Sequence, residues 1–254
     1  MSNKVGAKLE ELSHSGRKAV AWLIDPDDVN SSEVFEDRLL EAISLKVDFI
    51  FLGGSLIKQN SIYEIIRFIK KTQEDIPVVL FPGNSIQFSP LADALLFLSL
   101  ISGRNPDLLI GQHVSIAPLL ENSNVEILST GYMLVDGGET TSAHYISQTI
   151  PLPNHRPELA AATALAGKYL GMRYFYLDAG SGAPNPVCAE LIREVKQKTN
   201  SPLIVGGGLT SLEKIKTAYH AGADLVVIGN GAGKNPKLLS EVSAYLESIR
   251  ILAN

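Results

Sequence analysis

The chain has 254 residues, 45% of them hydrophobic, and a formal net charge of −5. This length suits one (β/α)₈ barrel or two smaller domains, and the absence of basic runs argues against a nucleic-acid partner. Cys188 is the only cysteine, which excludes an intramolecular disulfide and favours a cytoplasmic protein. The apolar stretches are too short to suggest a signal peptide or a membrane span.

Apolar runs alternate with amphipathic segments along the chain, after a leading helix at 4–15. The runs predict strands at 18–24, 48–52, 77–81, 94–98, 125–135, 173–178, 203–205 and 225–228. The amphipathic segments predict helices from Ser31 or Ser32 to 45, from 61 to 69, and over 107–122, 157–170, 187–199, 212–219 and 238–251. Eight such units predict an α/β fold with one TIM barrel over 1–254. The alternative, an open doubly wound sheet, would carry a glycine fingerprint after the first strand, where Asp25-Pro26 stands instead.

The third strand–helix unit departs from this alternation. Only 85–91 separates two predicted strands, whereas a parallel crossover normally needs a dozen or more residues. We therefore expect this unit to lack a regular helix and to leave a gap in the outer ring. The apolar residues near the gap either line a channel or, as is commoner, pack in the core: Phe88, Leu91, Leu95, Phe97 and Leu100. The polar loop 140–156 is long enough to be functional.

Two glycine-rich loops follow the last two predicted strands. Gly206 to Gly208 come directly after the seventh strand, and Gly229-Asn230-Gly231 come after the eighth. Glycine lets backbone N–H groups approach an anion, and loops at these two positions form the common phosphate site of (β/α)₈ barrels. A single loop could equally be a tight turn, but two in tandem favour phosphate binding.

Other polar residues stand at the predicted carboxyl ends of strands. Asp25 and Ser55, on neighbouring strands, offer a carboxylate and a hydroxyl for Mg²⁺, which otherwise takes water and substrate phosphate. Asp25 suits the cap of a helix equally well. Asp178 could act as a general base or only form a turn at the end of its strand. His113 and His144 belong to no zinc-binding pattern and are expected to be surface or structural residues.

Seven motifs taken together resemble one family. They are LIDPDD at 23–28, FLGGS at 51–55, PVVLFPGN at 77–84, LSLISGRNPDLLIG at 98–111, YLDAGSGA at 176–183, PLIVGGGL at 202–209 and ADLVVIGNG at 223–231. The chain resembles the geranylgeranylglyceryl phosphate synthase family, with its bacterial heptaprenylglyceryl phosphate synthase relatives. The resemblance extends from about Val20 to the last helix, in order and without large gaps.

The resemblance implies a prenyltransferase. Such an enzyme joins sn-glycerol 1-phosphate to a polyprenyl diphosphate, here geranylgeranyl diphosphate, through an ether bond and releases diphosphate with Mg²⁺ as cofactor. It implies Asp25 and Ser55 as metal ligands and Asp178 as the catalytic base. The implied substrate-binding residues are Tyr176, Leu177, Asp178, Ala179, Gly180, Ser181, Gly182, Gly207, Gly208, Gly229 and Asn230. It further implies dimers or hexamers, and the lipid product would bring the protein into transient contact with a membrane.

The chain departs from the family pattern at Asp178, where the family usually has glutamate. Aspartate is shorter by about 1.5 Å, one C–C bond. A misplacement near 1 Å can cost on the order of 100-fold in rate, so a shifted backbone or a water relay would be needed to restore the reach. Two alternatives stay open: another phosphate-binding barrel that acts as an isomerase or synthase, and a non-catalytic binder of prenyl or glycerol phosphates.

Overall fold

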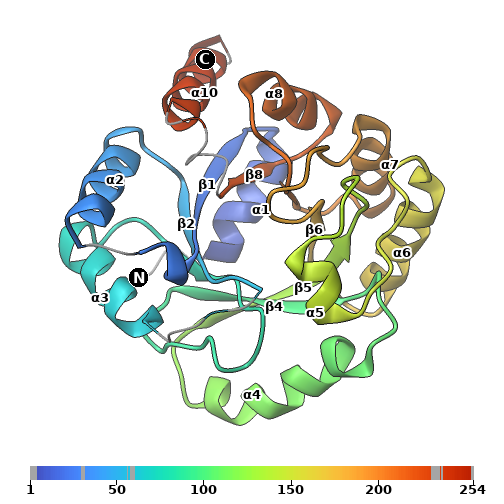
Figure 1. Ribbon diagram of the computed structural model, residues 1–254. Helices are drawn as coiled ribbons and strands as arrows, with labels where there is room; N and C mark the ends of the chain where they lie inside the picture. The colour runs from blue at the N-terminus through green and yellow to red at the C-terminus, as the bar shows by residue number, and fades with distance from the viewer. Residues whose placement is uncertain are drawn as a thin grey trace.

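The structure is a computed structural model that describes residues 5–29, 32–55, 57, 61–229, 235 and 237–252. Eight parallel strands form a closed barrel in sequence order, and β8 (Leu225–Ile228) pairs with β1 (Ala19–Ile24) to close it. Figure 1 shows helices arranged around this barrel. The closed sheet confirms the predicted (β/α)₈ fold and excludes the open doubly wound sheet.

The elements follow the predicted order. The remaining strands are β2 (Phe49–Leu52), β3 (Val78–Leu80), β4 (Ala94–Leu100), β5 (Glu126–Leu134), β6 (Tyr174–Asp178) and β7 (Leu203–Gly206). The helices are α1 (Val5–Ser15), α2 (Ser32–Ser44), α3 (Ile62–Thr72), α4 (Gln112–Glu121), α5 (Ser142–Ser147), α6 (Pro157–Tyr169), α7 (Ala189–Thr199), α8 (Leu212–Ala221) and α10 (Leu238–Leu252). Two expectations need correction. The predicted loop 140–156 contains α5, and the predicted helix 107–122 starts with a π-helical turn, Asp107–Gly111.

The third unit lacks its helix, as predicted. Residues 81–93, which link β3 to β4 and are all described, contain no helix. Pro82, Gly83 and Pro90 in this segment disfavour helical continuation. In Figure 1 the outer ring accordingly passes from α3 to α4 without a helix between them.

Alternation along the strands divides the core into two parts. In β2, Phe49 and Phe51 fill the barrel interior, whereas Ile50 and Leu52 pack under the outer helices. Helix α1 contributes its buried Val5, Leu9 and Leu12 to the interior core. None of the described helices has both the length and the apolar composition needed to cross a membrane.

Three aspartates tie neighbouring strands together at their amino ends. Each directly precedes a strand, donates its backbone N–H to one residue at the start of the previous strand, and accepts that residue's N–H with its carboxylate. The pairs are Asp48 with Val20, Asp93 with Val78 and Asp224 with Leu203. Each carboxylate also meets a cation, from Arg250, Lys70 and Lys196 respectively. This repeated contact fixes the register at the end of the barrel where the strands begin.

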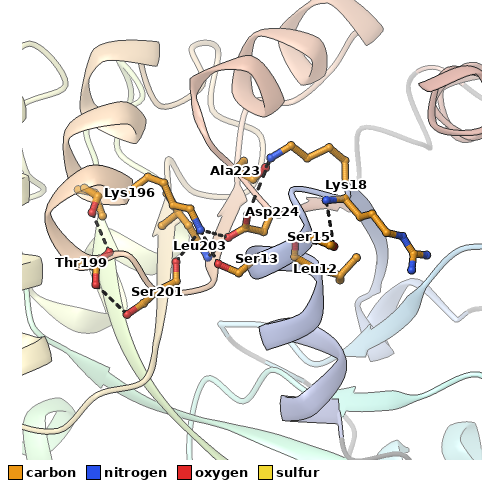
Figure 2. A network of polar contacts seen from close by, with 12 residues as sticks. Leu12, Ser13, Ser15, Lys18, Lys196, Thr199, Ser201, Leu203, Ala223 and Asp224 are labelled. Carbon is orange, nitrogen blue, oxygen red and sulfur yellow. Dashed lines mark hydrogen bonds and ion pairs between the residues drawn. The ribbon is translucent and has the colours of Figure 1, made fainter. Parts of the chain in front are cut away.

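Asp224 has the most enclosed of these three sites. Its Oδ2 lies 2.6 Å from Lys196 Nζ, and its Oδ1 lies 3.9 Å from Lys18 Nζ. Lys196 also donates to Ser13 Oγ of α1 at 2.6 Å and to the Ser201 carbonyl at 3.0 Å. Figure 2 shows this network, which joins α1, α7 and the starts of β1, β7 and β8.

Candidate active site

Because all eight strands are parallel, their carboxyl ends meet at one rim of the barrel. Asp25 follows β1, Ser55 follows β2, Asp178 ends β6, and Gly207-Gly208 and Gly229 follow β7 and β8. The structure therefore brings these sequence-predicted residues to the same rim. Asn230 and Gly231 lie outside the described residues.

Asp178 is the buried carboxylate of this rim, with an exposed fraction of only 7%. Its Oδ2 accepts a hydrogen bond from the Tyr132 hydroxyl at 2.7 Å, and its Oδ1 accepts one from the Gly180 N–H at 2.7 Å. Burial raises the pKa of Asp178, while these two hydrogen bonds and the nearby His144 oppose that rise. A carboxylate with a raised pKa is a better proton acceptor, which suits a general base.

Tyr132, which the sequence analysis passed over, covers Asp178 from β5. Its ring packs edge-on against Tyr176 at a centroid distance of 5.5 Å and against Phe81 at 5.9 Å. Phe81 and Tyr176 stack on each other at 5.1 Å, so the three rings form an aromatic layer below the rim. Burial and the charge of Asp178 hold the pKa of Tyr132 well above its usual range, so its hydroxyl remains a neutral donor.

A sequence signal could have identified Tyr132. In β5 the buried Leu128 and Thr130 alternate with partly exposed residues, and Tyr132 continues the same register toward the rim. A tyrosine at the rim end of an inward-facing series is well placed to meet the rim of the neighbouring strand, here Asp178.

The loop after β6 divides into a buried and an exposed part. Leu177 and Ala179 point into the core under the outer helices, so only their backbones can serve the rim. Gly180 is buried and has a φ of +90°, which favours glycine. Ser181 and Gly182 are exposed and can face a ligand from solvent.

The glycine loop after β7 packs directly against the loop after β6. Gly207 has a φ of +77°, and a Cβ there would lie 2.6 Å from Asp178 Oδ1 and 2.5 Å from the Gly180 nitrogen. Gly208 also has positive φ, at +68°. Only glycine allows the two backbones to approach this closely, which is the requirement for a cradle of backbone N–H groups. Gly229, beside Leu23, occupies the corresponding place after β8.

Asp25 serves as a cap, one of its two expected roles. Its Oδ1 accepts the Asp27 N–H at 3.0 Å at the start of a 3₁₀ turn. Its Oδ2 faces the loop after β2, because a Cβ on Gly54 would lie 2.9 Å from it. Gly54, which this carboxylate faces, directly precedes Ser55 in the chain.

The donor set at Asp25 and Ser55 is too small to bind a metal strongly by itself. Among the described residues, no group of three histidines, cysteines, aspartates or glutamates could hold a metal ion. One carboxylate and one hydroxyl do fit Mg²⁺ that completes its shell with phosphate oxygens and water.

An apolar cavity adjoins the rim where the third helix is missing. Phe88, Leu95, Phe97 and Leu100 line it, so these four are not only core residues, whereas Leu91 is 39% exposed and is not among the described lining residues. Polar groups stand at its rim end, namely Ser55, Asn84, Gln87 and Tyr132. The cavity thus extends from Tyr132, the hydrogen-bond partner of Asp178, toward α4, whose Ile116 also lines it.

Gln87 is a second residue that the sequence analysis missed. Its side chain is almost fully buried in the helix-free segment, donates to the Gly54 carbonyl at 2.8 Å and accepts the Gly54 N–H at 3.2 Å. This two-way contact holds the backbone next to Ser55.

The two candidate histidines are structural, and neither is a surface residue. His144 is buried and its Nδ1 accepts the Thr141 N–H at 2.9 Å, as part of a capping box at α5. His113 lines the cavity with its ring edge-on to Phe97 at 4.4 Å, and burial lowers its pKa.

Comparisons with known proteins agree with this geometry. A family model described as PcrB family matches residues 16–246. A geranylgeranylglyceryl phosphate synthase of Spirosoma linguale is 51% identical over 238 residues, which cover 94% of this chain and 95% of that protein. The protein of the same name from Pyrococcus horikoshii is 42% identical over 247 residues, covering 96% and 95%.

Solved structures of similar sequence share the fold, and one of them holds a substrate. That protein is (S)-3-O-geranylgeranylglyceryl phosphate synthase from Thermoplasma acidophilum in complex with its substrate sn-glycerol-1-phosphate. It superposes with a TM-score of 0.85 at 32% identity and covers 95% of this chain and 97% of its own.

Proposed function

The chain belongs to the PcrB family, and on that premise we propose that it is a geranylgeranylglyceryl phosphate synthase. It transfers a prenyl group from a polyprenyl diphosphate, geranylgeranyl diphosphate by its relatives' names, to sn-glycerol 1-phosphate. An ether bond forms and diphosphate leaves. The observation that carries this proposal is that an apolar cavity and a cradle of glycine loops meet at Tyr132 and Asp178.

Each substrate has a matching part of the rim. The backbone N–H groups around Gly182, Gly207 and Gly229 suit the phosphate of sn-glycerol 1-phosphate, because they offer donors without side chains in the way. The apolar cavity suits the prenyl tail, since it excludes water from a chain that has no polar groups. The diphosphate then lies between them, near Ser55.

The reaction needs a proton acceptor and a stabilised leaving group. Asp178 is the final proton acceptor when the glycerol hydroxyl attacks the allylic carbon. Asp25 and Ser55 would hold Mg²⁺, which when bound neutralises the diphosphate and makes it a better leaving group. Fixing both substrates on one rim contributes much of the rate, because the reacting atoms no longer have to find each other by diffusion.

One assay tests the activity directly. The protein is incubated with labelled sn-glycerol 1-phosphate, geranylgeranyl diphosphate and Mg²⁺, and the product is extracted into organic solvent. We expect organic-soluble label; its absence, while an authentic synthase works alongside, would reject the proposal. Binding of both substrates without turnover would instead favour a non-catalytic binder.

Two further features are proposed on the same basis. Chelation with EDTA should abolish turnover and Mg²⁺ should restore it, whereas full activity in EDTA would remove the metal from the mechanism.

The protein should also form dimers or hexamers in the cytoplasm, and light scattering that gives a monomer mass would contradict this assembly.

A further inference from the structure

Tyr132, and not Asp178, presents its side chain to the cavity. Among the described residues that line the cavity, Tyr132 is present and Asp178 is not. The Tyr132 hydroxyl covers Asp178 Oδ2, and Gly180 N–H occupies Oδ1. The backbone of Gly207 closes the space on the Oδ1 side, because a Cβ there would already lie 2.6 Å from this oxygen. Because Asp178 is only 7% exposed and is not among the described lining residues, a substrate hydroxyl that comes from the cavity meets Tyr132 first.

We propose that Tyr132 is a catalytic residue that contacts the reacting glycerol hydroxyl and relays its proton to Asp178. This inference rests on the proposed synthase activity. As the glycerol oxygen forms its bond to the allylic carbon, the bond from that carbon to the diphosphate oxygen breaks and diphosphate leaves with the electron pair. The proton of the glycerol hydroxyl passes to Tyr132 Oη, while the proton of Tyr132 passes to Asp178 Oδ2.

The relay accounts for the short side chain at position 178. Aspartate is shorter than glutamate by about 1.5 Å. The hydrogen bond from Tyr132 to Asp178 spans 2.7 Å, which more than makes up this difference. A phenol suits this position because its oxygen donates and accepts at the same time and stays protonated before the reaction.

Tyr132 also lies at the seam between the apolar cavity, which suits the prenyl tail, and the glycine loops, which suit the phosphate. It pairs in register with Tyr176 of β6 on one side and with Leu100 of β4 on the other. Leu100 lines the cavity, and β6 leads into the phosphate loops. A hydroxyl at this seam can therefore meet a glycerol whose phosphate is held on one side and a prenyl carbon that enters from the other.

The decisive variant is Tyr132→Phe, which keeps the ring and its packing against Phe81 and Tyr176. We expect its single-turnover rate to fall by about 10²- to 10³-fold, within the usual range for loss of a proton-transfer group. The matched control is Tyr219→Phe, which also removes a buried hydroxyl, one that donates to the Ala19 carbonyl at 2.8 Å. This control should turn over at the wild-type rate.

Two readouts separate a relay from a structural role. Tyr132→Phe removes a hydrogen bond that lowers the pKa of Asp178, so the acid limb of its pH–rate profile should move to higher pH. Asp178→Glu, combined with Tyr132→Phe, should recover at least about tenfold in rate, because the longer carboxylate reaches the hydroxyl directly.

The outcomes are distinct. If wild type makes product and Tyr132→Phe makes it equally fast, the relay is wrong and the synthase activity stands. A slow Tyr132→Phe whose acid limb does not move and which Asp178→Glu does not rescue would also overturn the relay, since it indicates a structural role of the hydroxyl. If wild type itself makes no product, the proposed function fails first.

Discussion

Two buried aspartates at opposite ends of the barrel have very different partners. Asp224, at the start of β8, is 1% exposed and faces the ammonium groups of Lys196 and Lys18. Asp178, at the end of β6, is 7% exposed, and its hydrogen bonds come from the neutral Tyr132 hydroxyl and a backbone N–H. No described lysine or arginine forms an ion pair with Asp178.

This difference in partners distinguishes an aspartate that stabilises the fold from one that takes part in the reaction. A buried carboxylate that faces cations forms ion pairs with them, and removing it leaves those cations without a partner. A buried carboxylate with only neutral donors has a raised pKa and gains from taking a proton. The amino end of the barrel therefore holds the fold, and the carboxyl rim holds a group prepared for proton transfer.

The largest expected effect is on turnover at the rim. Asp178→Asn removes the proton acceptor and should lower kcat by about 10³-fold. Binding of sn-glycerol 1-phosphate, measured by calorimetry, should stay measurable because the glycine loops supply most of its donors. An unaffected rate would remove Asp178 from the mechanism and make the two aspartates alike.

Asp224→Asn should have the opposite consequence. We expect a loss of about 3 kcal/mol in the free energy of unfolding, because Lys18 and Lys196 lose their carboxylate in a partly buried site. Urea denaturation measures this, and kcat of the folded variant should not change. The control is Asp93→Asn, whose contacts are similar but more exposed, with an expected loss of about 1 kcal/mol. Equal losses at both positions would show that burial is not what distinguishes Asp224.

Two glycines with positive φ, one at the rim and one away from it, extend the comparison of the two aspartates. Gly207→Ala strains the backbone and pushes its Cβ against Asp178, so kcat/KM should fall by about 100-fold. Gly222→Ala, with φ of +121° at the end of α8, should lower stability by about 1 kcal/mol and leave kcat/KM unchanged. Steady-state kinetics should be measured on both variants. If Gly222→Ala were the slower enzyme, the assignment of catalysis to the carboxyl rim would be wrong.

The smallest effect concerns pH. Because burial raises the pKa of Asp178, the unfolded chain releases this proton at lower pH than the folded chain does. The stability due to this group is thus fully present below the ordinary aspartate pKa of about 4 and is lost as pH rises through the folded pKa. Asparagine does not titrate, so Asp178→Asn should gain stability relative to wild type between pH 3 and pH 7. Urea denaturation across this range should reveal a rising difference; a falling one would mean that the pKa is lowered.

The sequence by itself determined the order of elements, the missing third helix and the rim that carries Asp25, Asp178 and the glycine loops. These features depend on local properties. Apolar runs, proline and glycine positions, and the rule that parallel strands end on one side are all readable from neighbouring residues. The motifs were dense enough to indicate the family before any contact was known.

Only the tertiary structure decided how the rim residues meet. Tyr132 and Asp178 are 46 positions apart, and Gln87 reaches Gly54 across 33, so no local pattern pairs them. The first contact joins neighbouring strands two positions apart in register, since Tyr132 pairs with Tyr176 and Asp178 pairs with Leu134. The second joins the loop after β2 to the segment between β3 and β4. The length of a side chain can be read from the sequence, but the group that it meets depends on how the barrel closes.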